Sequence, residues 1–258
     1  MTQLLLIKLG GSVITVKDRA LTPNTDAIDR LSHVLAKISD SLILVHGGGS
    51  FGHYWSVKYD MHTKPDLYDP RGISVVHESM VALNQIVVKS LSDAGLVPYG
   101  ISPASLFADG KENAPKFTEL IEFTRRGMVP VIFGDIVHTS KGRFSIISGD
   151  SLMTRIASSL MPSRVIFTVN VDGIYEDMRD KRLIEVLDFP RNDISYKDSS
   201  VDVTGGMGRK ISEAFKIARC GIDVNIVNGL DAGRVFNTLM GLEVKGTMIP
   251  AVPNKDRR

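Results

Sequence analysis

Lysines lie beside glycine-rich stretches of the sequence, and this combination could hold the phosphate groups of a ligand. The stretches are Lys8–Ser12, His46–His53 and Thr204–Lys210, and the nearby lysines are Lys8, Lys17 and Lys210. Glycine lets backbone N–H groups approach a phosphate closely, and a following helix adds the positive end of its dipole. Transfer of a phosphoryl group mainly needs cations against the transferring oxygens and aligned reactants. The pattern therefore predicts a site for phosphoryl transfer.

Lys8, Asp150 and His53 occupy the positions that most favour such chemistry. Lys8 interrupts a buried-looking strand just before a glycine turn, where an unpaired ammonium group is costly unless an anion meets it. Asp150 stands at the start of a predicted helix, so its carboxylate could either cap that helix or hold two lysines in position. His53 closes the second glycine-rich stretch, where it could donate a hydrogen bond to an acceptor phosphate.

Two familiar phosphate-binding fingerprints are absent or incomplete. The sequence has no G-x-x-x-x-G-K-[ST] run, which excludes a Walker-type P-loop. Gly47, Gly49 and Gly52 match G-x-G-x-x-G after a strand, but no strand leads to the acidic residues in Lys64–Asp69. The sequence therefore disfavours a dinucleotide site.

Apolar runs alternate with helix-length amphipathic segments, which predicts an α/β fold with a mostly parallel sheet covered on both faces. The expected strands are Leu4–Leu9, Leu42–His46, Val97–Ile101, Val129–Phe133, Val165–Val169 and Val224–Val227. The expected helices are Asn24–Ile38, Ile73–Ala94, Pro115–Arg126, Ser151–Leu160 and Gly206–Arg219. Because such sheets bind ligands at the carboxyl ends of their strands, these elements should bring the glycine-rich stretches together.

Two stretches depart from this alternation. Asp135–Ser148 alternates around Ser140-Lys141-Gly142, which predicts a β-hairpin. Glu176–Asp202 is rich in charged residues and predicts a surface excursion. We expect one domain over residues 1–258, with an internal division near Ser148–Gly149.

The composition restricts the class of protein and its surroundings. The net charge is +2, and no run of five like charges occurs, which argues against a nucleic-acid partner. Cys220 is the single cysteine, so no disulfide or cysteine-based metal site can form within one chain. No apolar stretch approaches the roughly 20 residues that span a bilayer, so we expect a cytoplasmic protein without a membrane partner.

Six motifs together resemble the amino acid kinase family, and more narrowly its isopentenyl phosphate kinases, over nearly the whole chain. They are K-L-G-G-S at Lys8–Ser12, T-V-K at Thr15–Lys17, H-G-G-G-S-F-G-H at His46–His53, S-G-D at Ser148–Asp150, V-D-G-I-Y at Val171–Tyr175 and T-G-G-M-G-R-K at Thr204–Lys210. The loop that ends in His53 is the narrower marker, because relatives that phosphorylate carboxylates, carbamate or uridylate typically lack a histidine there.

The resemblance implies a three-layer αβα fold and a homodimer that phosphorylates isopentenyl phosphate, using ATP and Mg²⁺. It places the acceptor in residues 1–148 and the nucleotide in residues 149–258. The implied catalytic residues are Lys8, Lys17, Asp150 and Lys210, and the implied acceptor-binding residues are Gly48, His53 and Gly149. The implied nucleotide-binding residues are Lys8, Gly10, Gly11, Ser12, Gly49, Asp172, Gly206 and Lys210, and no residue is assigned to a metal. No general base is required, because a phosphate monoester is already an anionic nucleophile.

One departure from the resemblance concerns the nucleotide side. Relatives commonly have T-D-V-D-G where this chain has Val169–Gly173, so a threonine and an aspartate are replaced by Val169 and Asn170. The base preference of the nucleotide site is therefore open, whereas the type of reaction is not.

Two other functions are weighed against this one. A kinase of the same fold could act on a phosphonate such as fosfomycin, which needs only a small polar site. An isopentenyl tail needs an apolar wall instead, which could come from Phe51, Tyr54, Val75, Val76, Met80 and Ile146. A non-catalytic nucleotide sensor could use the fold for binding alone, but it would not need the lysines together with Asp150.

Overall fold

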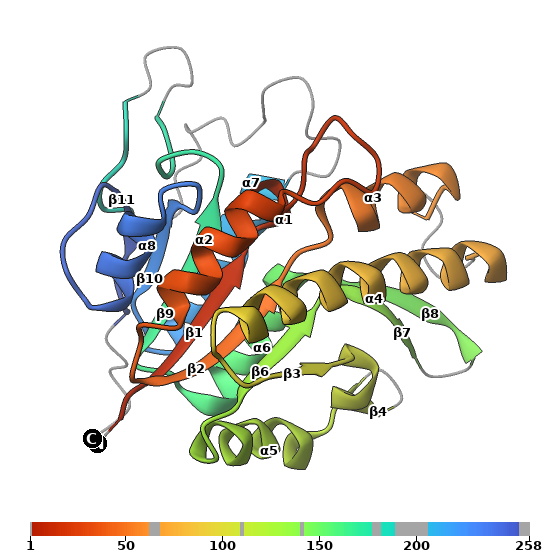
Figure 1. Ribbon diagram of the computed structural model, residues 1–258, viewed down its shortest axis with the longest axis horizontal. Helices are drawn as coiled ribbons and strands as arrows, with labels where there is room; N and C mark the ends of the chain where they lie inside the picture. Colours follow the sequence, from red (N-terminus) through yellow and green to blue (C-terminus); the bar gives the residue numbers. More distant parts are fainter. Residues whose placement is uncertain are drawn as a thin grey trace.

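The computed structural model describes residues 2–61, 68–108, 111–139, 142–176, 182–188 and 206–252. Within these ranges a central seven-stranded sheet has the order β11-β10-β9-β1-β2-β6-β3 (Figure 1). Its strands are β1 (Leu4–Leu9), β2 (Ser41–His46), β3 (Pro98–Ile101), β6 (Val129–Phe133), β9 (Arg164–Val169), β10 (Val224–Asn228) and β11 (Gly246–Ile249). Neighbouring strands are parallel except for β10 and β11. The predicted mostly parallel sheet is confirmed.

Helices cover both faces of the sheet and complete a three-layer αβα sandwich. One layer contains α1 (Gly11–Ile14), α2 (Thr25–Leu35), α3 (Gly49–Lys58), α4 (Pro70–Asp93) and α8 (Ala232–Leu239); the other contains α5 (Ala114–Arg125), α6 (Gly149–Leu160) and α7 (Gly206–Arg219). Leu5 and Ile7 of β1 pack with the first layer, and Leu6 packs with the second. Because successive side chains of a strand alternate between faces, Lys8 points to the layer of α6 and α7.

Short antiparallel pairs stand outside the central sheet. β7 (Asp135–His138) pairs with β8 (Phe144–Ile147), so the hairpin predicted over residues 135–148 is confirmed. Two residues of its turn, 140 and 141, lie outside the described residues. β4 (Phe107–Ala108) pairs with β5 (Lys111–Glu112), after the short 3-10 helix η1 (Pro103–Leu106). Most of the predicted excursion Glu176–Asp202 also lies outside the described residues.

The second glycine-rich stretch differs from its prediction. Residues 47–53 are predicted as one loop after a strand, whereas in the structure a helix, α3, begins at Gly49 and contains His53. Tyr54, Trp55 and Val57 follow within four positions and so point around the helix, and no single apolar stripe marks this segment as a helix. Among the helices that the structure describes, none is both long and apolar enough to cross a membrane.

Candidate active site

A cleft of about 1490 Å³ opens at the carboxyl ends of β1, β2, β6 and β9. The predicted site residues that line it are Lys8, Gly10, Gly11, Ser12, Lys17, Gly48, Gly49, His53, Gly149, Asp150, Gly206 and Lys210. Asp172 is not among the described lining residues, and its carboxylate contacts Arg234 at 2.7 Å and Lys245 at 2.6 Å. Hydrogen bonds from these two cations hold the pKa of Asp172 well below its usual range. Its role at the nucleotide stays a prediction.

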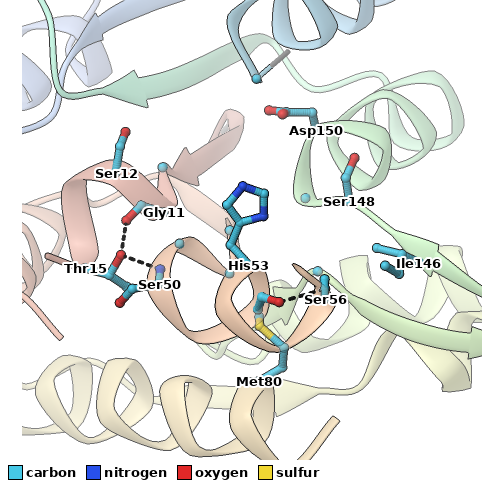
Figure 2. A pocket seen from close by; sticks show the side chains of 18 of the residues that line it. Gly11, Ser12, Thr15, Ser50, His53, Ser56, Met80, Ile146, Ser148 and Asp150 are labelled. Carbon is cyan, nitrogen blue, oxygen red and sulfur yellow. Dashed lines mark hydrogen bonds between the residues drawn. The ribbon is translucent and has the colours of Figure 1, made fainter. Parts of the chain in front are cut away.

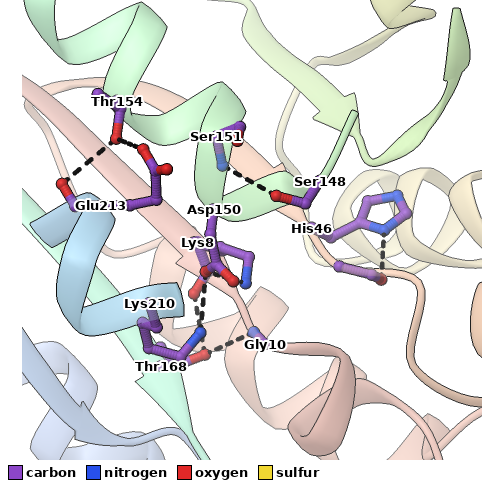
Figure 3. A network of polar contacts seen from close by, with 11 residues as sticks. Lys8, Gly10, His46, Ser148, Asp150, Ser151, Thr154, Thr168, Lys210 and Glu213 are labelled. Atoms are coloured by element: carbon purple, nitrogen blue, oxygen red, sulfur yellow. Dashed lines mark hydrogen bonds and ion pairs between the residues drawn. The ribbon is translucent and has the colours of Figure 1, made fainter. Parts of the chain in front are cut away.

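Lys8, Asp150 and Lys210 form a buried lysine–aspartate cluster in this cleft (Figure 3). Oδ1 of Asp150 accepts hydrogen bonds from Nζ of Lys8 at 2.7 Å and from Nζ of Lys210 at 2.9 Å. The three residues are 4%, 5% and 7% exposed, respectively. Asp150 does not cap α6, because the cap is Ser148, whose Oγ accepts from the N–H of Ser151. The carboxylate thus holds two ammonium groups side by side, which is the second of the two roles considered for it.

The electrostatics of the lysine–aspartate cluster favour an anionic ligand. Burial lowers the pKa of Lys8 to about 7, although the Asp150 carboxylate opposes this shift. Burial alone would raise the pKa of Asp150, but the charges of Lys210 and Lys8 outweigh it and hold that pKa well below its usual range. One carboxylate faces two ammonium groups. A buried cation without its own counter-charge is costly, and a phosphate group relieves that cost.

Glycine is required where the loops of the cleft converge. A Cβ atom on Gly149 would lie 2.8 Å from Cε of Lys8, and one on Gly11 would lie 2.3 Å from the backbone nitrogen of Gly49. Gly49 also has a φ of +46°, a conformation that side-chain-bearing residues rarely adopt. These approaches place the loops after β1 and β2 in direct contact and set the start of α6 against Lys8.

His53 stands beside an apolar part of the cleft (Figure 2). Its half-buried imidazole projects from α3 into the space between Gly11 and the start of α6. Behind it, Met80 packs under Gly48, since a Cβ there would lie 2.9 Å from the Met80 sulfur. Among the apolar residues proposed for a tail wall, Tyr54, Val76, Met80 and Ile146 line the cleft. Phe51 and Val75 are not among its described lining residues.

Two buried polar residues at strand ends hold these loops and are not among the predicted site residues. Oγ1 of Thr168 accepts from the N–H of Gly10 and donates to the carbonyl of Lys8, both at 3.0 Å. Nδ1 of His46 lies 3.2 Å from the carbonyl oxygen of Gly47. Burial lowers the pKa of His46 to about 4, so the ring is neutral at physiological pH. Their signal in the sequence is a polar residue at the end of an otherwise apolar strand.

The described residues offer no protein cage for a metal ion. No group of three or more His, Cys, Asp or Glu side chains gathers within the described ranges in a way that could hold one. The buried carboxylates in the cleft are already engaged, Asp150 with two lysines and Asp135 with Nδ1 of His77 at 2.6 Å. Mg²⁺ is commonly held by substrate phosphates and water in addition to carboxylates. The residues that the structure describes therefore do not fit Mg²⁺ by themselves, and an ion held among them would depend on the nucleotide phosphates.

Comparison with known proteins confirms the resemblance. Residues 3–228 match the model of the amino acid kinase family. An isopentenyl phosphate kinase of Methanothermobacter thermautotrophicus is 34% identical over 95% of this chain and 98% of its own. Another, of Thermoplasma acidophilum, is 34% identical over 83% of this chain and 86% of its own. The crystal structure of the T. acidophilum isopentenyl phosphate kinase product complex superposes with a TM-score of 0.79 at 31% identity, covering 96% of this chain and 100% of that one. The chain therefore belongs to the amino acid kinase family and, within it, to the isopentenyl phosphate kinases.

Proposed function

We propose that the protein transfers the γ-phosphoryl group of ATP to isopentenyl phosphate, forming isopentenyl diphosphate and ADP. The observation that carries this proposal is the lysine–aspartate cluster, which directs two buried ammonium groups into a cleft lined by glycine-rich loops. The relatives named isopentenyl phosphate kinase support the choice of acceptor.

The residues of the cleft act mainly through charge and alignment. An oxygen of the acceptor phosphate attacks the γ-phosphorus, and the bond from that phosphorus to the bridging oxygen of ADP breaks. A phosphate monoester has its second pKa near 6, so the attacking oxygen is already anionic at about pH 7 and no proton must be removed. Lys8, Lys17 and Lys210 place positive charge against the oxygens of the transferring group. Asp150 holds the ammonium groups of Lys8 and Lys210 in fixed positions by accepting a hydrogen bond from each.

His53, Gly48 and Gly149 are assigned to the acceptor phosphate, with the tail along the apolar part of the cleft. Tyr54 and Ile146 line the cleft and are 44% and 39% exposed, so a tail could cover apolar surface that now faces solvent. Each buried methylene contributes about 0.8 kcal/mol, so five carbons contribute at most about 4 kcal/mol. This apolar surface favours isopentenyl phosphate over fosfomycin, whose small epoxide would leave most of it uncovered.

The nucleotide is assigned to the glycine-rich loops and to the part of the chain from residue 149 onward. Gly10, Gly11, Ser12 and Gly49 are proposed to line its phosphates from one side, and Gly206 and Lys210 from the other. A homodimer and a cytoplasmic location stay predictions. Sedimentation of the purified protein tests for the homodimer, because a dimer has twice the mass of the 28.2 kDa chain.

A panel of acceptors tests the proposed reaction. Purified protein is incubated with Mg-ATP and isopentenyl phosphate, dimethylallyl phosphate, fosfomycin, uridylate or acetylglutamate, and the products are identified by phosphorus NMR. We expect a diphosphate product with isopentenyl phosphate and its near absence with Asp150→Asn, which controls for a contaminating kinase. Transfer to fosfomycin alone would support the phosphonate kinase instead. Binding of ATP in calorimetry without transfer to any acceptor would support the sensor.

A further inference from the structure

Thr15 joins the two glycine-rich loops that follow β1 and β2, and we propose that it is a positioning residue for phosphoryl transfer. The inference deepens the proposed kinase reaction and rests on it. Thr15 follows α1 directly, is 3% exposed and borders the cleft. Its hydroxyl is occupied by contacts within the protein, as Figure 2 shows. It therefore acts on the reaction through the residues that it holds.

The hydroxyl of Thr15 bridges the two loops. Oγ1 donates a hydrogen bond to the carbonyl of Gly11 at 2.7 Å and accepts one from the N–H of Ser50 at 3.0 Å. A hydroxyl has one proton to donate, so the Gly11 carbonyl uses the whole donor capacity of this side chain. Gly11 follows β1 and Ser50 follows β2, and these strands are parallel neighbours in the sheet. One buried hydroxyl thus ties the first glycine-rich loop to the second.

The two loops are packed so closely that the Thr15 bridge also fixes the positions of the neighbouring backbone groups. A Cβ atom on Gly49 would lie 2.1 Å from Oγ1 of Thr15, and one on Gly11 would lie 2.3 Å from the nitrogen of Gly49. In a trans peptide the C=O and the next N–H point in opposite directions, so fixing the Gly11 carbonyl also fixes the N–H of Ser12. Gly11, Ser12 and Gly49 all line the cleft and are assigned to the nucleotide phosphates. Thr15 therefore controls where that phosphate-binding backbone stands.

Thr15 is also connected to the groups assigned to the acceptor and to the transferring phosphoryl. Ser50, its hydrogen-bond donor, lies in the first turn of α3, three residues before His53. Lys17 lies two residues after Thr15, in a loop closed by a hydrogen bond from the Val16 N–H to the Thr22 carbonyl at 2.9 Å. A shift at Thr15 would therefore move donor-side and acceptor-side groups relative to each other.

This arrangement predicts a specific kinetic defect. A variant without the hydroxyl keeps every backbone group that is assigned to either substrate, so substrate binding should change little. The two reacting groups would meet in poorer alignment, and a misplacement of about 1 Å can lower a rate by about 100-fold. Loss of the hydroxyl should therefore lower kcat far more than it weakens the binding of either substrate.

Four variants test this role. Thr15→Val and Thr15→Ala remove the hydroxyl, and Thr15→Ser keeps it. Thr238→Val is the matched control, because Thr238 is 2% exposed, donates to the carbonyl four residues earlier at 2.8 Å and lies on α8, whose residues are not among the described lining of the cleft. We expect Thr15→Val to lower kcat about 10- to 100-fold with Kd values for ATP and isopentenyl phosphate within about threefold of wild type. Thr15→Ser should restore most of kcat, and Thr238→Val should lower the melting temperature without lowering kcat.

The outcomes separate this inference from the proposed function. If the wild-type protein transfers no phosphoryl group to isopentenyl phosphate, the proposed function fails. If the wild type is active but Thr15→Val keeps the kcat of Thr238→Val, or loses only substrate affinity, the role of Thr15 is overturned. Should Thr15→Val not fold, Thr15→Ala removes the same hydroxyl with less bulk and is judged by the same comparison.

Discussion

Asp150→Asn should destabilise the protein by an amount that can be worked out from the lysine–aspartate cluster. The substitution preserves shape but removes the charge that lies 2.7 Å from Nζ of Lys8 and 2.9 Å from Nζ of Lys210. Removing one partner of a buried ion pair costs about 3–5 kcal/mol, because the remaining charge stays buried without compensation. Burial already lowers the pKa of Lys8 to about 7, so Lys8 can release its proton and escape part of this cost. We therefore expect Asp150→Asn to lower the free energy of unfolding by an amount at the lower end of this range, about 3 kcal/mol near neutral pH.

Thermal unfolding followed by circular dichroism measures this cost. For a chain of about this size, 1 kcal/mol corresponds to roughly 2–4 °C, so the melting temperature should fall by about 6–12 °C. Asp26→Asn is the control, because Asp26 pairs with Arg30 within α2 and its side chain is 77% exposed. Exposed pairs contribute less than about 1 kcal/mol, so that variant should melt close to the wild type.

Anion binding and catalysis should respond in opposite directions in Asp150→Asn. For any given protonation of the two lysines, the site gains one positive charge, so inorganic triphosphate should raise the melting temperature of the variant more than that of the wild type. The lysines lose their common anchor, so kcat should fall by about 100-fold. An unchanged melting temperature, or a triphosphate shift smaller than in the wild type, would refute the reasoning that Asp150 compensates buried lysines.

Three further predictions concern individual side chains of the cleft. Lys17→Ala should lower kcat by about 100-fold or more with a much smaller rise in KM, because its contact serves mainly the transition state; an unchanged kcat in steady-state kinetics removes Lys17 from the mechanism. His53→Ala should impair use of isopentenyl phosphate while ATP binding in calorimetry stays near normal, and His53→Gln should retain more activity because it keeps a donor; equal loss of ATP affinity would contradict this role. The pKa of Lys8 near 7 in the free protein means that its charge is lost as pH rises, so kcat/KM for ATP should fall above about pH 7. Bound phosphates favour the charged form of Lys8, so kcat should fall only at higher pH. A kcat/KM profile for ATP that is flat between about pH 6 and 9 would contradict a role for the charge of Lys8.

Elements with a strong pattern could be predicted from the sequence, and elements without one could not. β1, β6 and α7 have the predicted bounds, because β1 and β6 are mostly apolar runs and α7 is a long amphipathic segment. α8 was not predicted because its eight residues fall short of the roughly 10–12 that distinguish a helix in a sequence, although Asp231 caps it as a helix start should be capped. β11 was not predicted because a four-residue edge strand that begins with glycine shows no alternation.

The candidate site could be predicted only as far as its local motifs reach. Three glycine-rich stretches with lysines nearby together indicate phosphate binding, and the predicted site residues that line the cleft come mostly from these stretches. The pairing of Lys8 with Asp150, which are 142 positions apart, is expected only as one of two roles for Asp150, and the contact of Gly10 with Thr168, 158 positions away, is not expected at all. The Thr15 hydroxyl shows the same limit, since nothing local indicates that it reaches Ser50 in the next glycine-rich loop.

The lysine–aspartate cluster lies at the boundary between two halves of the chain, residues 1–148 and residues 149–258. Strands from before residue 149 (β1, β2, β6 and β3) occupy one side of the sheet, and strands from after it (β9, β10 and β11) occupy the other. The halves meet where β1 pairs with β9 from Leu5 to Lys8. Lys8 comes from the first half, and Asp150 and Lys210 come from the second, so neither half alone can form the cluster or bury its charges. If the acceptor and the nucleotide bind in the halves proposed for them, the phosphoryl group crosses the boundary between the two halves during transfer. β1 is hydrogen-bonded to strands on both sides, so the central strand of the fold holds the lysine whose position the reaction requires.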